Sequence, residues 1–170
     1  MCEDYNDYVT RIVFLVKTLK MINAAHLHLL SNHFPIVLPF IGLLLLIAGL
    51  VLKSELVKRL AYILFVLGAI GAFITSFSGE QAEEIVEELG RNHHLMHEHE
   101  ELAERFALVS YILGLLSIAA FYLNWKNKPH KDIAMFIVMI VACATLFFAR
   151  QTGTSGGKIS HPEIGTVKEK

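Results

Sequence analysis

The sequence predicts an all-α integral membrane protein, built as a four-helix bundle with an amphipathic outer helix and a surface N-terminal helix. Hydrophobic residues make up 54% of the 170 residues and charged residues 18%, whereas soluble domains carry about 25% charged residues. The mean hydropathy is +0.51. Four long stretches contain no Asp, Glu, Lys or Arg, namely 34–52, 60–78, 106–125 and 133–149. Each is close to the roughly 20 residues that a helix needs to cross a bilayer.

Composition also excludes several classes of protein. A soluble globule and a disordered chain are excluded by the four apolar stretches. The net charge of −1 excludes a nucleic-acid binder that depends on phosphate contacts. Cys2 and Cys143 are too few for a disulfide framework, and the absence of a C-x-x-C-H motif from the sequence excludes covalent haem attachment.

The chain divides into an N-terminal interfacial segment (1–25), a four-span domain (26–150) and a glycine-rich outer tail (151–170). Apolar residues recur at helical spacing in the first segment, which predicts a helix lying on the membrane surface. Arg11 and Lys17 interrupt what would be the apolar region of a signal peptide. An alternative is that Met21 is the natural start.

Positive charge in the short links predicts the orientation. The link between the first two spans contains Lys53, Lys58 and Arg59, and the link between the last two contains Lys126, Lys128 and Lys131. The loop 79–105 is rich in glutamate instead. Because basic loops stay in the cytoplasm, we expect the acidic loop and both termini on the extracytoplasmic side.

The acidic loop is predicted to contain the amphipathic outer helix. Ser78 and Gln81 have the spacing of a capping box, and the apolar residues of 82–89 fall on one helical stripe. Gly90 then has the position of a C-cap, and Asn92 that of the N-cap of the helix leading into the third span.

Histidine supplies the candidate functional residues. Eight of the nine histidines fall on the outward side of the predicted topology: His26, His28, His33, His93, His94, His97, His99 and His161. His99 shares an apolar helical stripe with Leu95, Leu102 and Phe106 and should point into the bundle. An ionisable group on a buried stripe is a candidate site; the alternative is a core histidine paired with a carbonyl or a glutamate.

Further histidines are predicted around the outer mouth of the bundle. His33 precedes Pro35 at the start of the first span, where a ligand or proton-handling role is favoured. His26 and His28 are ligands or interfacial anchors. Gly156 and Gly157 allow positive φ and close backbone approach, so the tail could fold back and deliver His161; a solvated tail is the alternative.

A second metal site is suggested on the opposite face of the same helix. His93, His97 and Glu101 follow each other at i, i+4 spacing, which suits a divalent metal. The glutamates nearby favour a solvated charged face instead.

Four markers carry a family resemblance: H-L-H-L-L-S-N-H-F-P-I (26–36), S-G-E-Q-A-E-E (78–84), H-E-E-L-A (99–103) and G-G-K-I-S-H-P-E-I (156–164). With these the chain resembles a bacterial family of small four-span membrane proteins of unknown function. The resemblance implies a place in the bacterial inner membrane. Some relatives are joined to c-type cytochrome segments, which implies respiratory electron transfer by association. The histidines within the markers are His26, His28, His33, His99 and His161.

The favoured function is a b-type cytochrome that holds haem b non-covalently between helices. His33 with His99 is the first axial pair, and His28 or His26 with His161 the second. A periplasmic electron carrier or a larger respiratory complex would then be the partner, in addition to membrane lipid. The alternatives are a cofactor-free accessory or assembly subunit, and a zinc or proton-handling site of His and Glu. A redox carrier or subunit is favoured over a stand-alone enzyme.

Overall fold

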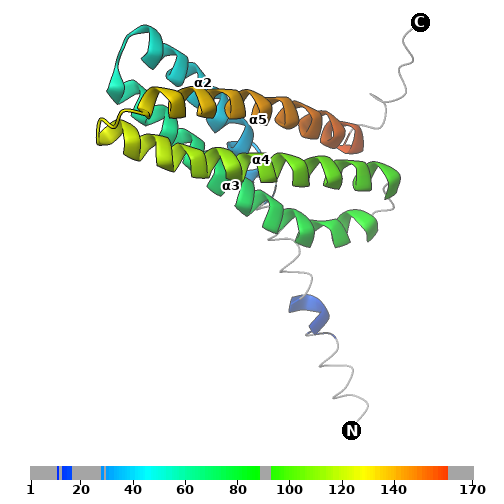
Figure 1. Ribbon diagram of the computed structural model, residues 1–170. Helices are drawn as coiled ribbons and strands as arrows, with labels where there is room; N and C mark the ends of the chain where they lie inside the picture. Colours follow the sequence, from blue (N-terminus) through cyan, green and yellow to red (C-terminus); the bar gives the residue numbers. More distant parts are fainter. Residues whose placement is uncertain (1–10, 12, 17–27, 29, 89–92, 161–170) are drawn as a thin grey trace, which may run out of the picture.

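The computed structural model describes residues 11, 13–16, 28, 30–88 and 93–160, with the backbone alone for 80–88, 93 and 160. Within these ranges four long helices follow one another: α2 (Phe34–Val51), α3 (Glu55–Glu88), α4 (His93–Trp125) and α5 (Lys131–Ser160). Each helix packs against the next, and α5 closes the bundle with a smaller contact to α2 (Figure 1). The predicted all-α bundle is confirmed.

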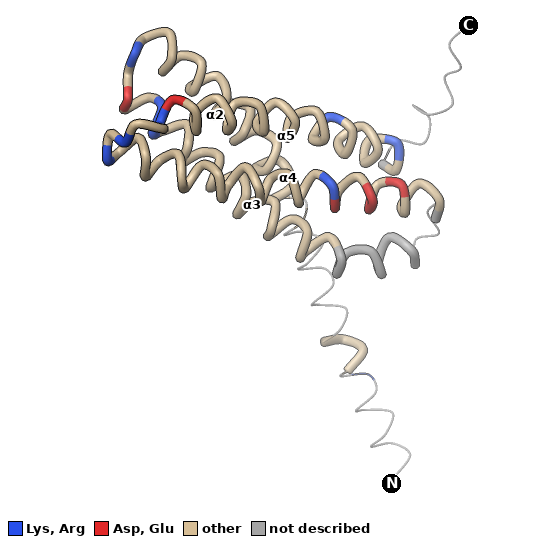
Figure 2. Tube along the Cα trace, in the orientation of Figure 1, with Lys and Arg blue, Asp and Glu red and all other residues tan. Residues whose placement is uncertain are grey.

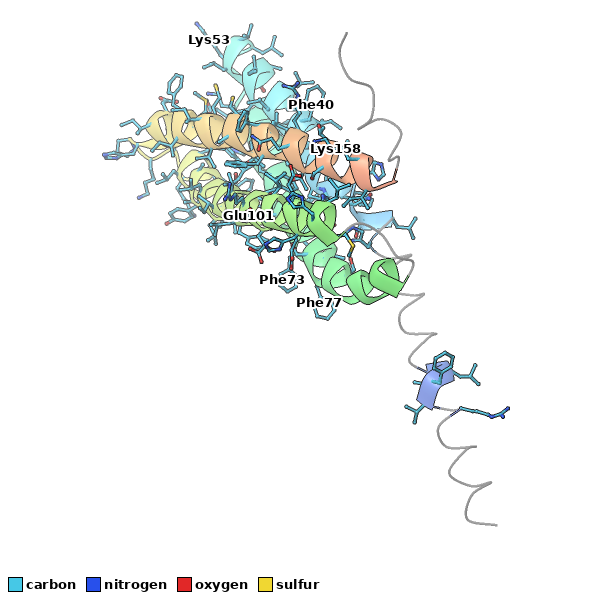
Figure 3. All side chains as sticks on the ribbon, turned by 90° about the vertical axis from the view of Figure 1, so that its right-hand side faces the viewer. Phe40, Lys53, Phe73, Phe77, Glu101 and Lys158 are labelled. Atoms are coloured by element: carbon cyan, nitrogen blue, oxygen red, sulfur yellow. The ribbon has the colours of Figure 1, made fainter. Side chains whose placement is uncertain are left out.

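Each of these helices contains a segment that is long and apolar enough to cross a membrane. The four segments are Phe34–Val51, Glu55–Gly79, His94–Trp125 and Lys131–Ile159. Figure 2 shows the charged residues of the helices at the two ends of the bundle, with an uncharged band between them. Apolar side chains such as Phe73 and Phe77 point outward from this band (Figure 3). The chain is therefore a multi-pass membrane protein.

Small residues let the helices approach closely. A Cβ atom on Gly42 of α2 would lie 2.7 Å from the Phe65 ring, and one on Gly68 of α3 would lie 2.9 Å from Pro39. Between α3 and α4, a Cβ on Gly114 would lie 2.6 Å from the Cβ of Ala69. Membrane helices pack largely through such close contacts, because lipid supplies no hydrophobic force that brings them together.

A polar network fixes the basic end of the bundle. The Glu55 carboxylate accepts from Lys58 Nζ at 2.9 Å and lies 3.7 Å from Lys131 Nζ. Asn124 donates to the same carboxylate and accepts from Arg59 Nε at 2.7 Å. The network joins α3, α4 and α5, so that most of their buried polar groups at this end are satisfied.

The outer amphipathic helix does not begin as predicted. Residues 82–88 are helical, but they continue α3 without a break. The Ser78 hydroxyl donates to the carbonyl of Ile74 at 2.9 Å and therefore does not cap a new helix. A serine inside a membrane helix satisfies its hydroxyl in this way by bonding the carbonyl one turn earlier. The predicted caps, Gly90 and Asn92, lie outside the described residues.

The glycine-rich turn after the fourth span is also absent. Helix α5 runs through residue 150 to Ser160, so Gly153, Gly156 and Gly157 are helical. Helix continuation keeps backbone groups paired near the apolar phase, and Thr152 Oγ1 donates to the Leu102 carbonyl at 3.0 Å, tying α5 to α4. His161 and the remaining tail lie outside the described residues.

The N-terminal surface helix stays a prediction. Residues 13–16 are helical and their apolar side chains are exposed. The rest of 1–25, apart from Arg11, lies outside the described residues.

Candidate functional site

Two histidines lie at the end of the bundle opposite the basic links. His28 comes from the turn that precedes α2, and His99 comes from the second turn of α4. Both side chains are half-buried. The termini of the described bundle, at the start of α2 and the end of α5, lie at this same end (Figure 1).

Backbone groups of α3 hold the His28 ring. Its Nδ1 lies 3.1 Å from the Thr75 carbonyl oxygen. A carbonyl can only accept, so Nδ1 carries the proton and donates. Hydroxyls line the same junction, because Thr75 Oγ1 donates to Ser31 Oγ at 3.2 Å, and Ser31 Oγ donates to the His28 carbonyl at 3.3 Å.

A serine of α5 holds the His99 ring. His99 Nδ1 lies 2.8 Å from Ser155 Oγ. The single Ser155 hydroxyl proton is directed at the Thr152 carbonyl, 2.9 Å away. With the hydroxyl assigned to that carbonyl, Ser155 Oγ accepts from His99, and Nδ1 is the protonated ring nitrogen in this assignment.

In its neutral form, each imidazole with its proton on Nδ1 presents Nε2 as the nitrogen with a lone pair. Metal-binding histidines have this arrangement, since the nitrogen that does not bind the metal donates to a carbonyl or another acceptor and fixes the ring. The two rings also lie within electrostatic range of each other. Two imidazole rings from separate segments of the chain are therefore held in fixed orientations.

Glycines lie against both rings. A Cβ on Gly79 of α3 would lie 3.2 Å from His28 Cε1 and Nδ1, and a Cβ on Gly156 of α5 would lie 3.2 Å from His99 Cε1. Gly156 therefore lets the helical backbone of α5 approach the His99 ring closely, whereas the sequence predicted a turn at this position. At Gly157 a Cβ would meet nothing within 4 Å.

His28, and not His33, is the described histidine within electrostatic range of His99. His33 is exposed at the N-cap of α2 and makes no side-chain capping bond there. The pairing of His33 with His99, which was the first expectation, therefore has no contact to support it among the described residues. His26 and His161 lie outside those residues.

The surface set of His93, His97 and Glu101 is not brought together by the described side chains. Glu101 pairs with Arg105, and His97 Nδ1 lies 3.5 Å from Glu100. The His93 side chain is outside the described part. Among the described residues, no group of three or more His, Cys, Asp or Glu side chains has the geometry to hold a metal.

The residues that sequence reasoning missed carry hydroxyl side chains. The Thr75 carbonyl holds the His28 ring, Ser155 Oγ holds the His99 ring, and Ser31 Oγ bonds the His28 carbonyl, yet none of the three was singled out. Their signal is position: Ser31 and Ser155 lie in or beside the quoted markers, and Thr75 lies three residues before one of them. A hydroxyl residue at the end of an apolar span, on a helix that faces a histidine, is the pattern to look for.

Comparison with known families decides the relationship. Residues 24–167 match the family described as "Predicted membrane protein (DUF2231)". The chain belongs to this family. Its markers and the two histidines of the site lie inside the matched range. No curated protein and no solved structure matches the chain.

Proposed function

We propose that this member of the family is a membrane metalloprotein that binds a redox metal through His28 Nε2 and His99 Nε2. The first candidate is the iron of a non-covalently held haem b, and the proposed role is electron transfer. The proposal places this site on the extracytoplasmic side of the bacterial inner membrane. The positively charged links at the opposite end of the bundle support this orientation.

The proposal depends on which ring nitrogen of His28 and of His99 is protonated. In each ring the Nδ1 proton is used by a partner within the protein, the Thr75 carbonyl or Ser155 Oγ. A solvated surface histidine has no such restriction and exchanges its tautomers freely. Holding both rings with Nε2 unprotonated is what two histidines would need in order to hold a metal.

The donor set fits haem iron. Two neutral imidazoles on separate segments of a helical bundle are a usual ligand pair for b-type haem. Asn32 lies one turn after His28, and its buried Oδ1 has no hydrogen-bond partner among the residues that the structure describes. Buried polar atoms are normally hydrogen-bonded. Asn32 Oδ1 could therefore accept a hydrogen bond from a group bound at this end of the bundle. When bound, haem iron supplies one-electron redox chemistry.

The chain's own residues would then have defined roles. His28 and His99 bind, while Thr75 and Ser155 orient the rings. Gly79 and Gly156 leave room for the rings. The surrounding apolar helices limit access of water to the site, which helps to set a reduction potential. A larger respiratory complex or an extracytoplasmic carrier would exchange the electron.

An absorption spectrum tests the proposal. The full chain is purified in detergent, and its visible spectrum is recorded before and after dithionite, together with its iron and zinc content. We expect a Soret band and a reduced α band in the wild type, both lost in His28→Ala and His99→Ala. His97→Ala is the matched control, because the His97 side chain is 83% exposed, and it should keep the spectrum.

Two other outcomes would change the conclusion. A colourless protein with stoichiometric zinc that is lost in His99→Ala would overturn the haem assignment and retain the two-histidine metal site. A colourless, metal-free protein after expression with haem precursor and metals supplied would overturn both.

A further inference from the structure

A groove runs between α2 and α5 on the outside of the bundle. Its volume is about 630 Å³. Five of its eight lining residues are apolar, and the complete lining is Ile36, Val37, Phe40, Leu146, Ala149, Arg150, Gly153 and Thr154. Figure 3 shows Phe40 on the α2 side of this groove. Neither His28 nor His99 lines it, so the groove is separate from the histidine site.

One end of the groove is positively charged. Arg150 is the first charged residue after the apolar stretch of α5 and is exposed, which places it at the membrane interface at the histidine end of the bundle. Within the described part of the chain, no carboxylate forms an ion pair with its guanidinium. Thr154 Oγ1 donates to the Arg150 carbonyl at 2.8 Å, so the hydroxyl oxygen keeps lone pairs for another donor.

Gly153 leaves the groove open one turn beyond Arg150. A Cβ at this position would meet no atom within 4 Å. A larger side chain at this position would not clash with the protein, and it would project into the groove. The groove depends on this glycine, while the packing of α2 on α5 does not.

We propose that the groove binds an anionic phospholipid, with one acyl chain along Val37, Phe40 and Leu146 and the phosphate on Arg150. The guanidinium forms paired hydrogen bonds to phosphate oxygens, a geometry that arginine suits well. The apolar lining continues from the interface toward the bilayer centre, as an acyl chain does. A neutral amphiphile would fill the same apolar surface but would leave Arg150 without a counter-ion.

Variants at Gly153 test binding of the acyl chain, and variants at Arg150 test binding of the phosphate. Gly153→Leu fills the groove, and Gly157→Leu is its matched control, because a Cβ on Gly157 also meets nothing within 4 Å and this residue lies outside the groove. Arg150→Gln removes the charge from the groove. Lys158→Gln removes one positive charge from α5 outside this groove.

Native mass spectrometry of the detergent-purified chain, titrated with phosphatidylglycerol or phosphatidylcholine of equal chain length, tests the proposal. We expect one phosphatidylglycerol to bind about fivefold more tightly than phosphatidylcholine. Arg150→Gln should abolish this preference, and Gly153→Leu should abolish binding of both lipids. Gly157→Leu and Lys158→Gln should behave as the wild type does.

Equal binding of the two lipids to the wild type would overturn the proposal. So would unchanged phosphatidylglycerol binding by Gly153→Leu. Helical circular dichroism and thermal unfolding of each variant would show that the fold is intact. The result does not depend on the histidine site, because the groove and the metal ligands share no residue.

Discussion

At the scale of single residues, the histidine site depends on what lies beside each ring. A partner for Nδ1 fixes the tautomer of His28 and of His99, and a glycine leaves space at Cε1. An added side chain at Gly79 or Gly156 would push the ring by several tenths of an ångström. Metal affinity responds steeply to such displacements, because ligand geometry is narrow.

We predict that Gly156→Val weakens metal or haem binding by about tenfold or more. The valine side chain would occupy space now held by the His99 ring, which lies 3.2 Å from the position of the first added carbon. The measurement is an absorbance titration of the purified apoprotein. Gly157→Val is the control, because its side chain meets nothing nearby. Equal affinities of the two variants would show that Gly156 has no part in placing His99.

At the scale of helices, small residues determine how closely the spans pack. Gly68 and Gly71 of α3 lie against Pro39 and against Phe34 and Pro35 of α2. They are used inside this chain for the α2–α3 contact. Gly114 has the same part in the α3–α4 contact, where it faces Ala69.

Alanine at two glycine positions should therefore have effects of opposite sign. In a helix alanine is favoured over glycine by roughly 0.5–1 kcal/mol, so Gly157→Ala should stabilise the protein slightly. In Gly114→Ala the new methyl group would lie 2.6 Å from the Ala69 Cβ, and such overpacking costs about 1–3 kcal/mol. Thermal unfolding in one detergent, followed by circular dichroism, measures both. Stabilisation by Gly114→Ala would contradict this packing.

At the scale of the whole molecule, charge is polarised along the bundle axis. Six of the ten Lys and Arg among the described residues lie in or beside the short links, while the described glutamates of α4 lie at the histidine end (Figure 2). Lys58, Arg59 and Lys131 are held by the Glu55 and Asn124 network. Positively charged short loops are retained in the cytoplasm during insertion, so the bundle should insert with the histidine site facing outward.

Cysteine labelling of intact cells tests this orientation. In a background with Cys2→Ser and Cys143→Ser, Glu100→Cys should react with a membrane-impermeable maleimide, because Glu100 lies at the histidine end. Lys128→Cys should react only after the cells are lysed. Labelling of position 128 in intact cells would place the histidine site on the cytoplasmic side.

Particular residues show how far sequence reasoning reached. His99 was expected to point into the bundle from its apolar stripe, and it is half-buried. The capping box at Ser78 was wrong, because the same hydroxyl bonds equally well inside a continuing helix. The glycine turn was wrong because glycine permits a turn without requiring one. Both local patterns are compatible with a helix end and with a continuing helix. Packing against the neighbouring helices determines which of the two forms.

The order of the residues alone determined four helices long and apolar enough to cross a membrane and the end at which each described histidine lies, because burial of apolar surface and the even number of crossings leave few other solutions. Tertiary structure decided that His28 lies near His99, with Thr75 and Ser155 as partners of the two rings. The distance between residues on different helices depends on how each helix is rotated and how deeply it is set. Those two quantities come from side-chain contacts such as Gly68 against Pro39, and not from periodicity along one helix.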